Sequence, residues 1–514
     1  MNRLKVRKAS SVPPTTSGAK RQVWTDSENL AVLLATGFLT RLLILNWFHA
    51  EITDGVLCLT YFQNHNYEIP RLTIFPLYPA LLGIFTALGL VGEVSGRFLS
   101  ASFGVLAIWP LYRLARRWSS PETAFLAGLA YLLSPLAWMW SLRTLPDTMF
   151  LFLFWMALER LAAVILDSDG DASLWKVAGL AFLAAGTRPE GLLLALWILL
   201  FLSRRPGGWR WAAALTAAML GTTFWAPVQS ILIHVLGAFR EGSVGLDDPF
   251  SHLLSSLWVY ITQPAWVFSP LLTLLAVGGL LEVVSRSDAA GKVWRRWILP
   301  ILALELALKM IPTNYQDRHL LPFLPGVCIL AALKFETWTQ TWENHHGAWG
   351  GMWRRNALAS LVLMYLMVFS VGVLVVQRDA FGDLKRNAEY LRLMPAETVT
   401  YTDEQFKTEY WSGRKVRIWD PGGERLRKGD LLVFHTLYTP RLNRLEESLF
   451  RNHRLEVIRR DQSSLLPLLT DLMMDPDLQN RATAVSRRAE AQYFETVTYR
   501  AIQDDPISQT GRNR

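Results

Sequence analysis

The first 377 residues alternate long apolar runs with short charged clusters, and this alternation constrains the fold more than any other feature. The runs are about 17 to 25 residues long, which is the length of helix that crosses the hydrocarbon core of a bilayer. Of the 95 Asp, Glu, Lys and Arg residues, 44 lie from Arg378 onward, so the last 137 residues are far more polar. The pattern predicts a polytopic membrane protein with a soluble C-terminal part.

The net charge of +9 lies mainly in an N-terminal basic arm. Residues 1–22 contain six basic residues and no acid, whereas the remaining charges are almost balanced. A basic arm ahead of an apolar helix is typical of a segment that stays in the cytoplasm, so nucleic acid is not an expected partner. The only cysteines, Cys58 and Cys328, exclude a disulfide framework and a cysteine-based metal site.

Basic residues also predict the topology. The predicted spans lie near 30–48, 97–113, 122–139, 147–164, 173–187, 190–203, 211–234, 264–283, 296–311, 320–336 and 356–377. Inside segments then contain 21 Lys and Arg residues, and outside segments before the tail contain 7, as the positive-inside tendency requires. Eleven spans place the N-terminus inside and the C-terminus outside. Thr25 and Glu28 have the spacing of a capping box, so the first helix is expected to begin there.

Two apolar runs need a different interpretation to keep this topology. The run at 76–91 is interpreted as a helix on the outer surface, because as a span it would place Arg113 and its neighbouring arginines outside. The run at 174–202 is interpreted as two short helices that turn at the Thr-Arg-Pro-Glu-Gly sequence of residues 187–191. That turn is then recessed in the outer leaflet.

The fold class that follows is an all-α multi-pass membrane bundle with external juxtamembrane helices and a small C-terminal α/β domain. Residues 1–29 are predicted to form a disordered cytoplasmic tail, because they contain too little apolar surface to fold alone. Residues 30–377 form the membrane domain, with an outer loop at 50–96, and residues 378–514 form the extracytoplasmic domain. The β-rich runs of that domain are 398–402, 416–419, 431–436, 456–459 and 493–499.

Acidic residues lie at the predicted outer ends of two helices. Glu51 and Asp54 follow the first span and are three residues apart, which places them on one side of a helical turn. Asp147 opens the fourth span. Each has an ordinary alternative: the first two acids belong to a solvated loop, and Asp147 is a first-turn acid that the helix dipole favours.

Arg188 and Glu190 are predicted at membrane depth, where a charge costs about 2.5 to 3.5 kcal/mol on insertion scales unless it is paired or hydrated. They therefore face a protein-lined cavity or pair only with each other. Asp317, Arg318 and His319 lie at the outer mouth of the tenth span, as part of a site or as a snorkelling cluster. Together these groups suit a lipid-borne phosphate, because Arg binds phosphate oxygens bidentately and a carboxylate can accept a proton from an attacking hydroxyl.

The order of these motifs resembles the GT-C glycosyltransferases, and within them the protein O-mannosyltransferases and the bacterial lipid A aminoarabinose transferases. The resemblance covers residues 30–336. It rests on the acidic loop Glu51 to Asp54, the juxtamembrane sequence Phe75-Pro-Leu-Tyr-Pro79, Arg97, Asp147 after a Ser-Pro helix, the sequence Thr187-Arg-Pro-Glu-Gly191 and the sequence Arg318-His-Leu-Leu-Pro322.

The resemblance implies transfer of a hexose or pentose from a polyprenyl- or dolichyl-phosphate donor to a lipid, glycan or protein acceptor on the outer face. No cofactor is certain, and a divalent cation is left open. Asp54 becomes the candidate general base, with Glu51 and Asp147 as further catalytic candidates. The candidates for binding the substrate and the lipid phosphate are Arg71, Arg188, Glu190, Arg318 and His319. No residue is assigned as a metal ligand.

Two positions differ from the pattern of the family. The acid that usually follows the catalytic Asp is Gly55 here, so a second acid is missing unless Glu51 substitutes. The basic residue that relatives often carry before the juxtamembrane proline is Phe75. Phosphate binding would then depend more on Arg71 or Arg318.

Two other classes of protein are alternatives to this interpretation. A transporter or lipid flippase also holds charges near the membrane, but a single large outer loop and the lack of a repeat of interrupted helices disfavour it. A non-catalytic scaffold that displays the C-terminal domain leaves Arg188 and Glu190 unexplained. The chain contains no Asn-x-Ser/Thr site, which favours a bacterial plasma membrane over the endoplasmic reticulum.

Overall fold

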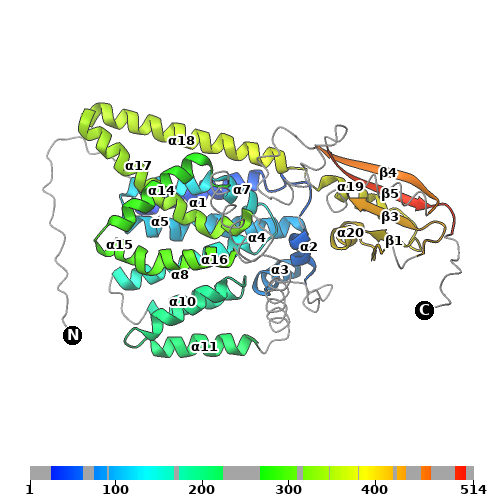
Figure 1. Cartoon of the computed structure of the whole chain (residues 1–514), viewed down its shortest axis with the longest axis horizontal. Helices are drawn as coiled ribbons and strands as arrows, with labels where there is room; N and C mark the ends of the chain where they lie inside the picture. The colour runs from blue at the N-terminus through cyan, green and yellow to red at the C-terminus, as the bar shows by residue number, and fades with distance from the viewer. Residues whose placement is uncertain are drawn as a thin grey trace, which may run out of the picture.

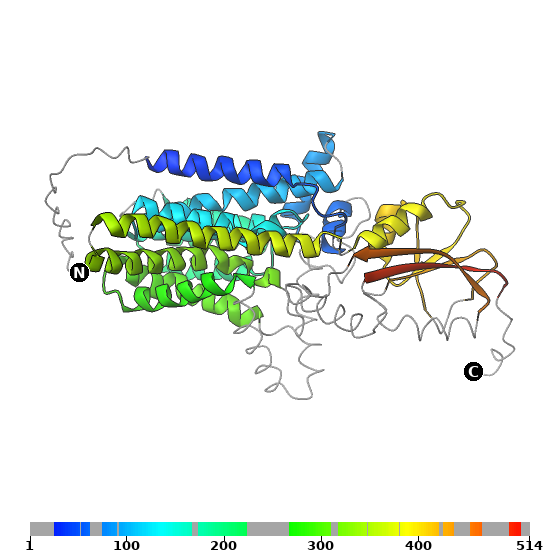
Figure 2. The same cartoon turned by 90° about the horizontal axis from the view of Figure 1, so that it is seen from above.

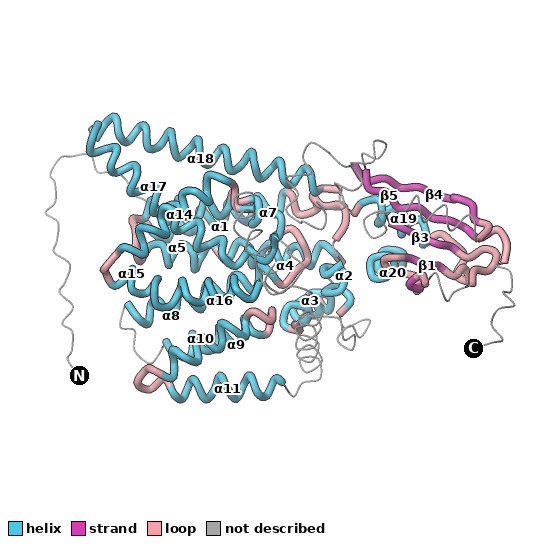
Figure 3. Tube along the Cα trace, in the orientation of Figure 1, coloured by secondary structure: helices cyan, strands magenta, loops and turns pink. Residues whose placement is uncertain are grey.

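A helical bundle and a small β-sheet lie at opposite ends of the molecule (Figures 1 and 3). The computed structural model describes residues 25–51, 53–61, 75–89, 92–166, 173–223, 267–309, 317–346, 348–379, 381–420, 425–435, 453–464 and 493–504. The predicted disorder of the basic arm and the position of Arg71 lie outside these residues.

The bundle is built from fourteen of the described helices. They are α1 (Asp26–Leu43), α4 (Glu93–Leu106), α5 (Ile108–Arg116), α6 (Pro121–Leu132), α7 (Pro135–Ser141), α8 (Asp147–Leu166), α9 (Leu174–Ala185), α10 (Gly191–Ser203), α11 (Trp209–Thr223), α14 (Pro270–Ser285), α15 (Ala289–Val293), α16 (Leu299–Lys309), α17 (Leu324–His346) and α18 (Ala348–Gln377). A π-helical turn, Trp294–Ile298, joins α15 to α16, and a 3-10 turn, η4 (Asp317–Phe323), leads into α17. Two further helices, α2 (Thr53–Thr60) and α3 (Leu77–Ala87), lie at the end of the bundle that faces the sheet (Figure 1).

Within the described residues, four helical segments are long and apolar enough to cross a membrane. They are Glu93–Arg116, Asp147–Leu166, Arg318–Trp342 and Arg354–Val375. Two helix pairs, α6 with α7 and α14 with α15–α16, bend by 56° and 104°, and counting each pair as one span gives six. The prediction from the sequence counted the second pair as two spans, near 264–283 and 296–311. The count of eleven spans stays a prediction. On α18, Leu361, Met364, Met367 and Val368 are all exposed, as side chains that face lipid would be.

The first helix begins where the sequence predicts. The Thr25 hydroxyl accepts a hydrogen bond from the Glu28 backbone N–H, and the Thr25 N–H donates to the Glu28 carboxylate at 2.7 Å, which together form a capping box. Helix α3 has 11 residues, a length of about 17 Å. It is too short to cross a core of about 30 Å, in agreement with its interpretation as a surface helix.

The apolar run at 174–202 forms two helices, α9 and α10, that pack against each other. The turn between them carries Arg188 and Glu190. Its tightness depends on Gly191, because a Cβ atom there would lie 2.2 Å from the carbonyl oxygen of Ala184. No side chain fits at that distance without moving the backbone of α9, so the glycine fixes how the two helices meet.

Helix α8 lies within the bundle and is buried along most of its length. Trp155 of this helix is fully buried, and its indole N–H donates to the carbonyl oxygen of Pro322 at 2.7 Å. This bond ties η4 to α8. The helix that presents Asp147 at its first turn therefore also positions the turn that carries Arg318.

The C-terminal part of the chain forms a five-stranded sheet with two helices. The elements are α19 (Gly382–Leu391), β1 (Thr400–Thr402), α20 (Gln405–Ser412), β2 (Arg417–Ile418), β3 (Leu431–His435), β4 (Leu455–Ser464) and β5 (Tyr493–Ala501). The strand order is β2-β1-β3-β5-β4. Strand β1 pairs in parallel with β2 and β3, and β5 pairs antiparallel with β3 and β4. Each of the five β-rich runs in the sequence contributes one strand.

Helix α19 lies on one face of the sheet through a buried polar network (Figure 2). The Asp383 carboxylate accepts hydrogen bonds from Ser463 at 2.6 Å and Thr496 at 2.7 Å, and its other contact is His435 at 2.9 Å. Burial alone would raise the pKa of Asp383, but His435 and the two hydroxyls hold it below its ordinary value. The network fixes the rotation of α19 about its axis.

We expect a Gly191→Ala substitution to destabilise the protein by about 1 to 3 kcal/mol, because the new Cβ overlaps the backbone of α9. Gly179 within α9 is a matched control, since no atom lies within 4 Å of its Cβ position. Gly179→Ala should leave stability unchanged or raise it by about 0.5 to 1 kcal/mol. Thermal unfolding of both variants in detergent checks this, and equal stabilities would show that the close approach is unimportant.

Candidate active site

An ion pair between Asp54 and Arg318 lies where α2 meets η4. The guanidinium Nη2 is 2.6 Å from the Asp54 carboxylate, whose side chain is 39% exposed, whereas that of Arg318 is 13% exposed. Burial alone would raise the pKa of Asp54, but Arg318, by its charge and hydrogen bond, and the charges of Arg188 and Lys407 hold it below the ordinary value of 3.8. Asp54 is therefore an ionised carboxylate at neutral pH that solvent can reach.

A second guanidinium group, that of Arg188, is shared by two acids. Its Nε and Nη2 atoms bind both carboxylate oxygens of Glu190 at 3.0 and 2.9 Å, and its Nη1 atom donates to Asp147. Arg188 and Glu190 thus pair with each other, and they also connect the α9–α10 turn to the first turn of α8. The charge of Arg188 also acts on Asp54 and lowers its pKa, so the two groups are electrostatically coupled.

Glu51 has a different environment from Asp54. It precedes α2, is fully buried, and contacts Arg97 Nε at 2.5 Å and the Thr144 backbone N–H at 3.1 Å. Its other neighbour is Gly55, because a Cβ at that position would lie 3.0 Å from Glu51 Oε2. The Glu51 carboxylate therefore fills the space that a side chain at residue 55 would need.

The structure says less about the two remaining candidates from the sequence, His319 and Arg71. His319 lies in η4 beside Arg318 and is half-buried. Arg71 lies outside the described residues. Among the residues that the structure does describe, no group of three or more His, Cys, Asp or Glu side chains could hold a metal ion.

Three charged residues near this site were not assigned a role from the sequence. Glu305 of α16 is fully buried, and neither of its carboxylate oxygens has a hydrogen-bond partner within the described part of the chain, although it interacts electrostatically with Arg188. Its position in an apolar run was a usable signal, since an acid within a span is a functional candidate by default. Glu93 and Lys407 gave no such signal, because their partners come from distant parts of the chain.

Comparison with known proteins identifies the fold. The sequence family described as dolichyl-phosphate-mannose-protein mannosyltransferase matches residues 73–234. The solved structure of ArnT from Cupriavidus metallidurans bound to undecaprenyl phosphate is 14% identical, covers 84% of this chain and 96% of its own, and superposes with a TM-score of 0.52. The chain has the GT-C fold. No curated protein sequence matches it significantly.

A second group of similar structures comes from Archaeoglobus fulgidus. Its oligosaccharyltransferase AglB, in complex with an inhibitory peptide and a dolichol-phosphate, is 14% identical with a TM-score of 0.51, over 80% of this chain and 70% of that one. A complex of the oligosaccharyltransferase with Zn and sulfate gives a TM-score of 0.52 at 14% identity, over 79% and 67%. The apolar helices and these similar structures together indicate that the chain is an integral membrane protein. Its fold is the GT-C fold that the resemblance predicts.

Lys407 of α20 supports a prediction about pH. It is fully buried, its Nζ lies 3.8 Å from the centroid of the Phe381 ring, and α20 packs against α2. The pKa of Lys407 is lowered from 10.5 to about 8, mainly by burial and in part by the charge of Arg143, while the charges of Glu404 and Asp383 partly oppose the shift. Between these two values the unfolded chain holds a proton that the folded protein has lost, so stability rises with pH in that window.

We therefore expect the stability of the wild type, relative to a Lys407→Met variant, to increase by roughly 3 kcal/mol between pH 7 and pH 10.5. Below pH 8 the difference should be constant. Thermal unfolding of both proteins across this range measures it. A difference that does not change with pH would mean that folding does not lower the pKa of Lys407.

Proposed function

We propose that this chain is an integral-membrane glycosyltransferase that transfers one sugar from a polyprenyl- or dolichyl-phosphate donor to an acceptor on the outer face of the membrane. The observation that carries the proposal is the pairing of the accessible Asp54 carboxylate with Arg318, beside the group formed by Arg188, Asp147 and Glu190. The GT-C fold supports it, and so does the lipid phosphate bound to ArnT in the similar structure.

The paired groups can perform the two tasks of such a transfer. The acceptor oxygen attacks the anomeric carbon of the sugar while the bond from that carbon to the phosphate oxygen breaks. The lipid phosphate leaves with the electron pair, and Arg318 stabilises its charge through two parallel N–H···O bonds. Asp54 takes the proton of the acceptor hydroxyl. Arg188, oriented by Asp147 and Glu190, adds positive charge on the same side.

The ion pair also suggests how the donor activates the base. While Arg318 contacts Asp54, the pKa of that carboxylate is low and it is a weak base. A phosphate that binds Arg318 competes for the guanidinium group and removes the strongest cation from Asp54. The carboxylate then becomes more basic only when the donor is present, so proton removal is coupled to donor binding.

Glu51 is proposed as a positioning residue within this site. Its carboxylate is fully buried and already contacts Arg97 and the backbone of Thr144. Removing one partner of such a buried pair typically costs about 3 to 5 kcal/mol, because the other charge is left uncompensated. Glu51 therefore holds the segment before α2 in place, while Asp54 remains accessible to substrate.

We expect Asp54→Asn to reduce transfer by about 10²- to 10⁴-fold without loss of folding, because the amide keeps the shape and cannot accept the proton. Arg318→Lys should retain more activity than Arg318→Ala, since Lys keeps the charge but not the bidentate fork. The measurement is transfer from a panel of radiolabelled polyprenyl-phosphate sugars by the purified protein.

Arg204→Ala, at an exposed position after α10, is the control and should keep full activity. Size-exclusion profiles and thermal unfolding of every variant separate loss of function from loss of fold. Near-normal transfer by Asp54→Asn together with loss in Glu51→Gln would move the base to Glu51. Normal transfer by both variants would reject the proposed role of this loop.

The same proposal places the C-terminal sheet outside the cytoplasm. Cys58 and Cys328 are both buried, so a single introduced cysteine dominates labelling. An impermeant maleimide applied to intact cells should modify a Glu456→Cys variant on β4 and leave an Arg204→Cys variant unmodified until the cells are permeabilised. Labelling of Arg204→Cys in intact cells would overturn this topology.

A further inference from the structure

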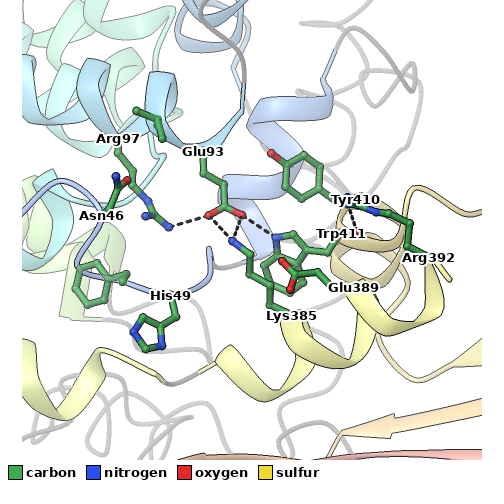
Figure 4. A pocket seen from close by; sticks show the side chains of 11 residues that line it. Asn46, His49, Glu93, Arg97, Lys385, Glu389, Arg392, Tyr410 and Trp411 are labelled. Carbon is green, nitrogen blue, oxygen red and sulfur yellow. Dashed lines mark hydrogen bonds and ion pairs between the residues drawn. The ribbon is translucent and has the colours of Figure 1, made fainter.

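A cleft of about 580 Å³ lies between the bundle and the C-terminal sheet unit, outside the Asp54 site (Figure 4). The bundle contributes α4 and the segment after α1, and the C-terminal unit contributes α19 and α20. The lining residues are Asn46, Phe48, His49, Glu93, Val94, Arg97, Lys385, Glu389, Arg392, Tyr410 and Trp411. Its volume is within the range of small-molecule sites, about 300 to 1,000 Å³.

The two sides of α19 explain why polar groups face this cleft. Asp383 and Asn387 point to the sheet, where both are buried in hydrogen bonds to strand side chains. Lys385, Glu389 and Arg392 are spaced by four and three residues, so they share one side of the helix, and all three line the cleft. The sheet-side network therefore holds these three groups toward the bundle.

The positive charges of the cleft are already largely compensated. Glu93 accepts from Arg97 at 2.9 Å, from Lys385 at 3.1 Å and from the indole N–H of Trp411 at 2.7 Å (Figure 4). Arg97 also contacts Glu51. A strongly anionic ligand would have to compete with these carboxylates, so the cleft is poorly suited to bind one through charge.

The cleft also offers hydrogen-bond donors, an acceptor and an aromatic ring. Glu389 is an exposed carboxylate that accepts hydrogen bonds, and Arg392 and Asn46 can donate. Burial raises the pKa of Tyr410, so its phenol keeps the proton and can donate or accept. A ligand that carries many hydroxyl groups both donates and accepts, and its C–H faces suit a ring with a polar tip.

The wall of the cleft is joined to the proposed reaction site by a short chain of contacts. Arg97 on its wall contacts Glu51 at 2.5 Å. Glu51 in turn lies against Gly55, the residue next to Asp54. A ligand against Arg97 therefore lies next to the residue that holds the acidic loop, on which Asp54 is located.

We propose that this cleft binds the acceptor, a neutral glycan chain, and directs its terminal hydroxyl toward Asp54. The inference rests on the proposed glycosyltransferase function and specifies the acceptor class. A peptide acceptor is less compatible, because the sides of the cleft are helices and charged side chains rather than a free strand edge that could pair with an extended chain.

The test measures binding separately from catalysis. The full-length protein in lipid nanodiscs is titrated with neutral tetrasaccharides of mannan, arabinan and galactan, with a heparin tetrasaccharide and with a Ser/Thr-rich decapeptide. We expect at least one neutral sugar to bind. Glu389→Gln or Tyr410→Leu should each weaken the affinity for that sugar by about tenfold. A loss of this size corresponds to one hydrogen bond to a charged group or to one ring contact. Glu397→Gln, an exposed acid of the same unit outside the cleft, should bind normally.

Asp54→Asn should also bind the sugar normally, so failure of the transfer reaction and failure of this inference are distinguishable. In the transfer assay, Glu389→Gln should raise KM for the acceptor while KM for the donor and kcat stay unchanged. Four outcomes overturn the proposal: no neutral sugar binds, binding is insensitive to both cleft variants, only heparin binds through these residues, or only the peptide does.

Discussion

At the end of the bundle that faces the sheet, two arginines pair with acids of the segment 51–54, and the two ion pairs differ in their access to solvent. Arg97 and Glu51 are both nearly inaccessible, so their pair is fixed and holds the acidic loop against α4. Arg318 and Asp54 form a pair that solvent reaches from the carboxylate side, so a ligand can replace one partner. The first pair is part of the scaffold, and the second is suited to exchange partners during a reaction.

The features that the sequence predicted correctly are those that depend on neighbouring residues. The capping box at Thr25 involves a contact three residues away. The hairpin of α9 and α10 was predicted because a Thr-Arg-Pro-Glu-Gly sequence interrupts an apolar run, and the strands because β-rich runs alternate with turns. Asp54 and Arg318 were both named from motifs, but their pairing joins residues more than 260 positions apart and no local motif shows it.

Most of what could not be predicted depends on which residues distant in the sequence contact each other. Asp54 was named as the candidate base through the family resemblance, but the different environment of Glu51 could not be predicted, because only the fold brings Arg97 and Thr144 to that acid. Glu305 is an acid in an apolar run, and the charge that acts on it, that of Arg188, lies in the turn between α9 and α10. The bend of 104° between α14 and α15–α16 could not be predicted for a related reason, because the length of an apolar run does not show how two helices meet.

Glu93 joins the C-terminal sheet unit to the bundle, because it binds residues of both parts. Its single carboxylate binds Arg97 of the bundle and also Lys385 and Trp411 of the C-terminal unit, 292 and 318 residues further along the chain. Separation of the two parts would leave Lys385 without this acid and would open the wall of the cleft. Lys407 acts in the same direction, because its charge reaches Asp54 only while α20 packs on α2. The C-terminal unit is therefore part of the electrostatic environment of the site, and its contact with α4 and α2 determines how the acidic loop is held.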